Sequence, residues 1–231
     1  NFKKNFKNIN PLICFSVKSN SNLKILSLIN KFGLGADVVS KGELLRVLKA
    51  KIKPEKIVFS GVGKTIDELK FAVSKKILLI NTESESEIIE IEKIAKKNKK
   101  KINIGIRFNP DTDAKTLKKI STGKKENKFG LTGKKFIEIL KKYKNSKFVN
   151  IICLSVHIGS QITSHVPYKN MLNAVNKVIQ LSKYKFKYID LGGGMGIQYQ
   201  NNSNKLDYLK YNKLIKSFLK KNNSKIIFEP G

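Results

Sequence analysis

Residues 12–18 read LICFSVK, a strand-length run of apolar and β-branched residues that ends on a lysine. Seven further apolar runs of strand length follow along the chain. The eight runs cover residues 12–17, 34–39, 57–59, 77–80, 102–108, 151–156, 188–191 and 226–228. Continuous apolar runs are typical of strands that are covered on both faces, as in parallel sheets.

Segments with the spacing of amphipathic helices separate these runs. The first two carry Ile25, Leu26 and Ile29, and then Leu44, Leu45 and Leu48, each set on one helical face. Five later segments repeat the pattern, with apolar positions at 69, 72 and 73; 88, 91 and 94; 136, 139 and 140; 171, 172, 175 and 179; and 214, 215 and 218. Capping-box spacing marks three helix starts, at Ser40/Glu43, Thr65/Glu68 and Ser84/Glu87.

Strand and helix therefore alternate seven times before an eighth strand ends the chain. This order predicts an α/β fold, a (β/α)8 TIM barrel formed as a single domain by residues 1–231. A doubly wound open sheet is the alternative architecture. In a barrel the functional residues lie at the carboxyl ends of the strands. The longest loop candidate, residues 109–130, is long enough to be functional.

Composition narrows the class of protein. With 40% hydrophobic residues in 231, we expect a packed core. Neither a membrane-spanning run nor a signal peptide is visible, so no membrane partner is expected. Cys14 and Cys153 lie inside apolar runs, which favours buried thiols in a reducing cytoplasm. We expect no metal site, because neither cysteine has other metal-ligating residues nearby.

The net charge of +30 suggests nucleic acid as a partner at first sight. Yet Arg46 and Arg107 are the only arginines, and the chain is also rich in Asn and Ile. Lys, Asn and Ile share A/T-rich codons, so a biased genome explains the charge. Nucleic-acid sites favour arginine forks and stacked aromatics, which do not cluster here. We therefore expect no nucleic-acid partner.

Polar residues at the strand ends are the candidates for chemistry. Lys18 is placed to be a desolvated amine that forms a Schiff base with an aldehyde cofactor. The glycines 192–194 follow the seventh strand, where barrels often bind phosphate. Glu229 could hold a ring nitrogen, and His157 could stack on a ring or transfer protons. Arg107 offers a guanidinium fork.

Each of these residues also has a structural explanation. Lys18 is one lysine among many, the glycines could form a tight turn, and Glu229 could lie on the surface. His157 could be a core histidine, and Arg107 could be an arginine without a special role. Glu43 is accounted for by its capping box with Ser40, and His165 by the start of a helix.

Taken in order, the motifs resemble the diaminopimelate decarboxylases, a family of fold-type III enzymes that use pyridoxal 5'-phosphate (PLP). The resemblance spans essentially the whole chain. The motifs that carry it begin at Phe15 (FSVKSN), Gly35 (GADVVSKGEL), Phe59 (FSGVGK), Arg107 (RFNPD), Ile120 (ISTG), Asn127 (NKFG), His157 (HIGSQ), Asp190 (DLGGG) and Glu229 (EPG).

This resemblance implies an alanine-racemase-like barrel and a lyase of lysine biosynthesis, which decarboxylates meso-2,6-diaminopimelate to L-lysine. It implies that Lys18 and His157 are catalytic, with Lys18 as the Schiff-base lysine and His157 stacked on the ring. It implies PLP contacts by Ser160, Gly192, Gly193, Gly194, Glu229, Pro230 and Gly231, with support from Asp37, Glu43 and Arg107. The partners implied are an amino-acid substrate and a second copy in a homodimer.

Two departures from the family pattern are visible. Phe15 and Ser19 replace a usual Tyr and Ala around the lysine. The chain also begins at Asn1 and ends on Glu229-Pro-Gly231, so we expect a fragment without an N-terminal segment and truncated before a C-terminal β-domain. Two alternatives stay open: a decarboxylase of the same fold acting on ornithine, arginine or carboxynorspermidine, and a PLP-binding protein without catalysis.

Overall fold

Strand pairing closes the sheet into a barrel. The computed structural model describes residues 2–110, 129–198 and 205–231, and within them the strands form a closed parallel barrel in the order β1 to β8. β8 pairs with β1 through Ile13 and Phe228, which excludes the open sheet. The strands are β1 Leu12–Ser16, β2 Gly35–Val38, β3 Ile57–Phe59, β4 Leu79–Thr82, β5 Ile102–Arg107, β6 Val149–Ser155, β7 Tyr188–Asp190 and β8 Lys225–Phe228.

All eight predicted strands are confirmed, and no boundary is displaced by more than two residues; only at β4 do both ends move by that much. The apolar run predicted residues 77–80, whereas β4 covers Leu79–Thr82 and ends on the buried polar residues Asn81 and Thr82. Hydropathy alone placed the strand too early, because its last two residues are polar but face the protein interior.

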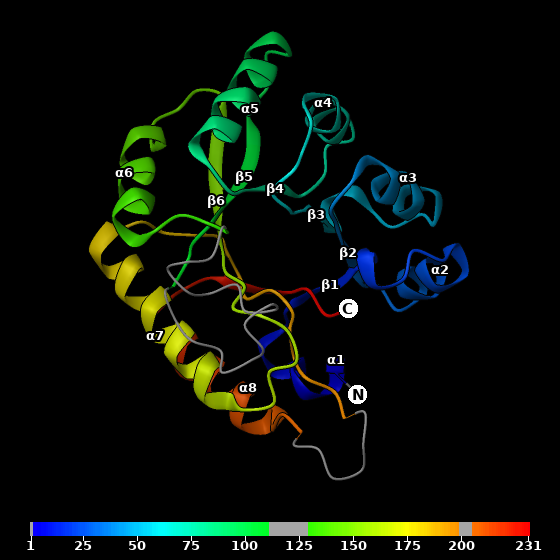
Figure 1. Ribbon diagram of the computed structural model, residues 1–231, viewed down its shortest axis with the longest axis vertical. Coiled ribbons are helices and arrows are strands. Elements are labelled where there is room, and N and C mark those ends of the chain that lie inside the picture. Colours follow the sequence, from blue (N-terminus) through cyan, green and yellow to red (C-terminus); the bar gives the residue numbers. More distant parts are fainter. Residues whose placement is uncertain (1, 111–128, 199–204) are drawn as a thin grey trace.

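The predicted helices form an outer ring around the strands (Figure 1). They are α2 Leu23–Lys31, α3 Lys41–Lys49, α4 Ile66–Ser74, α5 Glu85–Lys97, α6 Gly133–Tyr143, α7 His165–Ser182 and α8 Tyr208–Leu219. The periodicity did not predict four short elements, which are α1 Phe2–Asn5, η1 Lys7–Ile9, η2 Val17–Ser19 and η3 Pro54–Lys56. Elements of three or four residues are too short to show a period of 3.6.

The apolar face predicted for each helix is buried at its centre, but some residues at its edges are exposed. Leu26 and Leu44 are fully buried, whereas Ile25 and Leu45 are exposed at the edges of their helices. No helix in the parts of the chain described by the structure combines the length and hydropathy needed to cross a bilayer.

Only one of the three predicted capping boxes is complete. At the start of α4, Thr65 and Glu68 each accept a hydrogen bond from the backbone N–H of the other. Ser40 and Ser84 cap their helices in the same way. Their partners Glu43 and Glu87, however, reach one residue further back, to the N–H groups of the residues that precede the two serines.

The barrel interior has an apolar layer beneath a polar one. Side chains two residues apart on a strand point to the same side of the sheet. The apolar cluster inside the barrel contains Cys14, Val58, Leu79, Cys153 and Ile227. Two positions after each of these comes a polar residue: Ser16, Ser60, Asn81, Ser155 and Glu229. The interior is therefore a closed apolar plug with polar groups at its carboxyl end.

Both cysteines belong to the apolar plug. Cys14 and Cys153 are free and buried, and burial raises the pKa of each thiol well above its ordinary value. The prediction of buried thiols is confirmed. The two groups are neutral and shielded from solvent.

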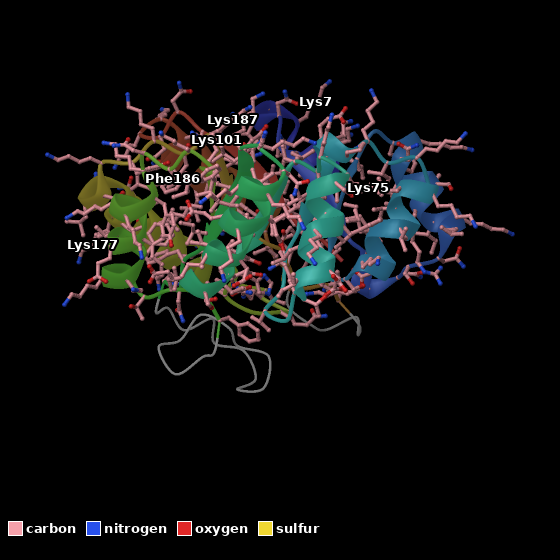
Figure 2. The ribbon with its side chains drawn as sticks, turned by 90° about the horizontal axis from the view of Figure 1, so that it is seen from above. Lys7, Lys75, Lys101, Lys177, Phe186 and Lys187 are labelled. Atoms are coloured by element: carbon pink, nitrogen blue, oxygen red, sulfur yellow. The ribbon has the colours of Figure 1, made fainter. Side chains whose placement is uncertain are left out.

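Lysines cover the outside of the barrel. Figure 2 shows Lys7, Lys101 and Lys187 on one side of the molecule, and the latter two directly precede β5 and β7. That side is the amino end of the strands, opposite to the polar layer.

Lys64 is a buried exception among the lysines. Its Nζ donates to the carbonyls of Gly61 and Asn81 and forms an ion pair of 2.8 Å with Glu87 Oε1. The Lys64 side chain is 0% exposed. This one amine therefore joins the loop after β3 to the end of β4 and the first turn of α5.

Replacing Lys64 by Met should lower the free energy of unfolding by about 3–5 kcal/mol, because Glu87 and two carbonyls lose their buried partner. Lys70→Met is the matched control, since Lys70 pairs with Asp67 on the surface, and we expect a change within about 0.5 kcal/mol. Denaturant unfolding of both variants measures the difference. Equal effects would contradict the structural role of Lys64.

Candidate functional site

A cavity of about 690 Å³ opens at the carboxyl ends of the strands. Residues from the ends of all eight strands line it. The predicted site residues among them are Lys18, Asp37, Arg107, His157, Ser160, Gly193, Gly194, Glu229, Pro230 and Gly231. Gly192 is the exception, since it lies buried just beneath His157. The fold thus brings together residues more than 200 positions apart in the sequence.

Seven polar side chains, which we call the polar layer, lie at the floor of this cavity, and all of them except the buried Asp190 line it. Its members are Ser16, Asp37, Ser60, Asn81, Ser155, Asp190 and Glu229. Hydrogen bonds connect them across the barrel: Asn81 Nδ2 donates to Ser60 Oγ at 3.2 Å and to Asp190 Oδ2 at 3.0 Å. Ser60 Oγ in turn donates to Glu229 Oε1 at 3.2 Å.

Lys18 lies in η2, immediately after β1, and lines the cavity. Its side chain is exposed rather than desolvated, which corrects the expectation of a desolvated amine. The nearest strand residue, Ser16, is tied down on both sides. Its N–H donates to the Pro230 carbonyl at 2.8 Å and its Oγ donates to Asp37 Oδ2 at 3.0 Å. The backbone that carries Lys18 is therefore anchored to β8 and β2.

His157 follows β6 and is half-buried in the cavity wall. The Gly193 N–H donates to His157 Nδ1 at 3.4 Å, so Nδ1 is an acceptor and carries no proton. Burial, followed by the positive charges of Arg107 and Lys18, lowers the pKa of His157 to about 3. The imidazole is therefore neutral at physiological pH.

The three glycines after β7 are required by packing. Gly192 and Gly194 adopt positive φ angles of 64° and 81°, which favour glycine. A Cβ on Gly193 would collide with the Glu229 carbonyl, and one on Gly194 would collide with the Gly159 carbonyl. The backbone of this loop consequently lies against the cavity without side chains in between.

Arg107 is neutralised by a residue that the sequence did not single out. Its Nη1 forms an ion pair of 2.8 Å with Glu83 Oε1, and its guanidinium lies 5.0 Å from the centre of the Phe129 ring. The second oxygen of Glu83 accepts the Gly130 N–H at 3.0 Å. Arg107 thus has a structural role at the cavity wall, where it fixes the residues on either side of the loop 109–130.

Three carboxyl groups share the polar layer. Burial raises the pKa of Asp37 to about 6, with the nearby Asp190 as the second cause. Burial also raises the pKa of Asp190, and burial together with the charges of Asp190 and Asp37 raises that of Glu229 well above its ordinary value. Asp37 Oδ1 is buried and accepts no hydrogen bond. The layer therefore retains protons that separate, exposed carboxylates would lose.

The remaining predicted residues divide into two groups. Ser160, Pro230 and Gly231 lie on the cavity wall. Glu43 does not line the cavity, and its carboxylate accepts the N–H of the cavity residue Val39. Its indirect support of the lysine and the ring stays a prediction. The motif residues Asp111, 120–123, 127 and 128 lie outside the described residues.

Sequence reasoning missed the inward-facing polar residues Asn81, Ser155 and Asp190. All three lie at or next to the end of a strand. Ser155 and Asp190 were read as parts of apolar runs, and Asn81 falls just outside the run predicted for residues 77–80. The signal that could have found them is their position two residues after an interior apolar residue. In the part of the chain that the structure covers, no three His, Cys, Asp or Glu side chains are grouped to hold a metal ion.

Comparison with known sequences identifies relatives along the whole chain. Residues 1–231 match the family model described as "Pyridoxal-dependent decarboxylase, pyridoxal binding domain". Similar proteins include the diaminopimelate decarboxylases of Helicobacter pylori, 43% identical over 100% of this chain and 58% of the relative, and of Aquifex aeolicus, 42% identical over 95% and 53%. The chain thus spans little more than half the length of these relatives.

Solved structures agree with the sequence comparison. The diaminopimelate decarboxylase from Helicobacter pylori complexed with L-lysine superposes with a TM-score of 0.95 at 42% identity, over 100% of this chain and 59% of that one. The enzyme from M. jannaschii in complex with L-lysine gives a TM-score of 0.88 at 31% identity, over 100% and 57%. The chain therefore belongs to the pyridoxal-dependent decarboxylase family, whose cofactor is pyridoxal 5'-phosphate.

Proposed function

We propose that the protein containing this chain decarboxylates meso-2,6-diaminopimelate to L-lysine, with Lys18 as the residue that binds PLP covalently. The observation that carries the proposal is the meeting of Lys18, His157, Gly193 and Glu229 in one cavity at the mouth of the barrel. Relatives named diaminopimelate decarboxylase, with 37–43% identity, support the choice of substrate.

The residues present fit PLP. The cavity offers an amine for the aldehyde on Lys18, and side-chain-free backbone at Gly193 and Gly194 where a phosphate could approach. It offers a hydroxyl on Ser160 for the phosphate and a carboxyl on Glu229 for the ring nitrogen. A volume of about 690 Å³ is within the range of ligand sites.

When bound, PLP supplies an electron sink for the electrons of the breaking carbon–carboxyl bond. The chain's own residues bind and orient it. Glu229 offers a carboxyl whose raised pKa lets it hold a proton at the ring nitrogen. His157 presents a neutral imidazole, which can pack against a ring without adding charge. The exposed Lys18 amine remains accessible to an incoming aldehyde.

Pro230 and Gly231 complete the cavity wall beside Lys18. A Cβ on Gly231 would lie 3.3 Å from the side chains of both Ser16 and Ser19, so this position is adjacent to the turn that carries the lysine. We propose that both residues contact the cofactor through their backbone. Asp37 lies on β2, the other strand that pairs with β1. Its carboxylate and the positive charge of Lys18 attract each other.

Homodimer formation, a cytoplasmic location and the absence of nucleic-acid binding belong to the same proposal. The neighbour that is an arginine decarboxylase is 22% identical and shows the fold alone. An assay that compares substrates is therefore needed to identify the one that the protein decarboxylates.

We expect the full-length protein, supplied with PLP, to release CO₂ and L-lysine from meso-2,6-diaminopimelate. Ornithine, arginine and carboxynorspermidine should react at least about 100-fold more slowly, the discrimination that a few specific polar contacts give. Product analysis by mass spectrometry measures all four. Faster turnover of another substrate would replace the proposed one, and PLP binding without any turnover would identify a non-catalytic protein.

Borohydride reduction of the PLP-loaded protein should fix the cofactor on the peptide that contains Lys18. Lys18→Arg should abolish this label, because a guanidinium does not form the covalent link. Lys24→Arg, an exposed lysine outside the cavity, is the matched control and should leave the label unchanged. Peptide mass spectrometry locates the label, and its appearance on another lysine would disprove the assignment.

Asp37→Asn should stabilise the cofactor-free protein relative to wild type as the pH rises from about 4 to 6. Folded wild type holds a proton on Asp37 up to a pKa of about 6, whereas the unfolded chain releases it near its ordinary value of 3.8. The wild type therefore loses stability over this window, by up to about 3 kcal/mol at ~1.4 kcal/mol per pKa unit. His157 acts in the opposite direction in both proteins and cancels in the difference.

Unfolding by denaturant at several pH values measures this difference. Asp67→Asn serves as the control, because it is the same substitution at an exposed position on α4, outside the polar layer. A flat difference for Asp37→Asn would contradict a raised pKa at this position.

A further inference from the structure

Asp190, at the end of β7, is fully buried beneath the cavity and does not line it. Three donors converge on its carboxylate. The Gly192 N–H donates to Oδ1 at 2.9 Å, and Oδ2 accepts from Asn81 Nδ2 at 3.0 Å and from Ser155 Oγ at 3.4 Å. None of these groups reacts in the proposed function. Donors of this number and kind stabilise the charged form of a carboxylate.

The carboxyl group of Glu229 is next to that of Asp190: β7 pairs with β8 through Asp190 and Ile227, and the Glu229 N–H donates to the Gly192 carbonyl at 2.8 Å. The charge of Asp190 also raises the pKa of Glu229. At these positions the two carboxyl groups can share a hydrogen bond. Two carboxyl groups form such a bond only when one of them carries a proton, because ionised carboxylates only accept. Among the described residues, one side-chain donor reaches Glu229, the Ser60 hydroxyl at 3.2 Å, whereas Asp190 accepts from two side chains and one backbone N–H. The proton therefore belongs on Glu229, and Asp190 is the acceptor.

Other charged or titratable groups act on this pair from four neighbouring elements. They are Asp37 on β2, Arg107 on β5, and the thiols of Cys14 on β1 and Cys153 on β6. Both thiols are neutral, and Arg107 is already paired with Glu83. Of the negative charges that act on Glu229, that of Asp190 has the largest effect on the Glu229 pKa.

We propose that Asp190 is a positioning residue, which keeps a proton on Glu229 and orients its O–H group along the hydrogen bond between the two carboxyls. The inference rests on the proposed function in one respect, namely that Glu229 faces the cofactor's ring nitrogen. Asn81 and Ser155 contribute by holding Asp190 in place.

The consequence concerns the pair formed by Glu229 and the ring nitrogen. The fixed negative charge of Asp190 opposes a second negative charge at its side. With a ring nitrogen beside Glu229, its O–H group would turn from Asp190 to the nitrogen, and the Glu229–nitrogen pair would keep the one proton over a wider pH range than it would without Asp190. A ring nitrogen that keeps this proton remains electron-withdrawing, which is the state that the proposed decarboxylation needs.

The experiment follows the carboxyl carbon of Glu229 in the cofactor-free full-length protein, labelled with ¹³C at glutamate carboxyls. Glu229→Gln identifies the resonance by its loss. In wild type the resonance should titrate well above the ordinary range of glutamate. Asp190→Asn should lower that pKa by about one unit or more, since it removes the like charge and leaves an amide that can donate.

Ser155→Ala is the matched control within the same layer, because it removes one long hydrogen bond from Asp190 and leaves every charge in place. We expect the Glu229 titration to move little in this variant. An unchanged titration in Asp190→Asn, or an equal shift in Ser155→Ala, would overturn the proposal.

A second measurement keeps the proposal testable if Asp190→Asn does not fold. Glutamine has the shape of a protonated glutamate, and its amide can donate to Asp190. Glu229→Gln should therefore keep the wild-type unfolding midpoint at pH 5 and exceed it at pH 8. A lower midpoint at both pH values would show that Glu229 is not the proton carrier.

Failure of this inference and failure of the proposed function are distinguishable. Both measurements use the protein without PLP, so they remain valid whichever lysine binds the cofactor. Borohydride labelling on Lys18 tests the function independently. If Lys18 is labelled, the absorption of the bound cofactor can be followed as the pH is raised. The transition should occur at a lower pH in Asp190→Asn than in wild type.

Discussion

The pairing of β1 with β8 is the constraint on which the rest of this structure depends. Ile13 lies beside Phe228 in the register, and the Ser16 N–H donates to the Pro230 carbonyl. Without this closure, Lys18 and Glu229 would be at opposite edges of an open sheet. With it, they share a cavity, and seven of the eight strands each place one residue of the polar layer beneath it, while β5 places Arg107 in the wall. The closure also fixes which side chains point inward, because register and side-chain direction are linked.

The cavity floor shows a conflict between stability and chemistry. Three carboxyl groups are buried close together, and the cations nearest to them are an exposed lysine and an arginine that already has a partner. Such an arrangement costs stability in the cofactor-free protein. It resembles a site prepared for a ligand that brings its own positive charge.

The sequence predicted the barrel well because the pattern is repeated: eight apolar runs alternate with amphipathic segments, and each repeat supports the others. Strand ends then led to Lys18, His157 and Glu229. The same reasoning failed where neighbouring residues in space are far apart in sequence. Asn81 and Asp190 come from strands three positions apart in the barrel, so their hydrogen bond is invisible to periodicity. The exposure of Lys18 and the pairing of Arg107 with Glu83 depend likewise on tertiary packing.

The burial of Lys64 sets its reactivity apart from that of the surface lysines. Amine-directed reagents such as those of reductive methylation modify lysines that solvent can reach, and this chain carries them in great number. The Lys64 amine is fully enclosed by two carbonyls and a carboxylate, so it should escape modification while the fold is intact. Its slow labelling would then report how often the loop after β3 opens. Because Lys64 holds one wall of the cavity together, its rate of modification would measure how often that wall opens.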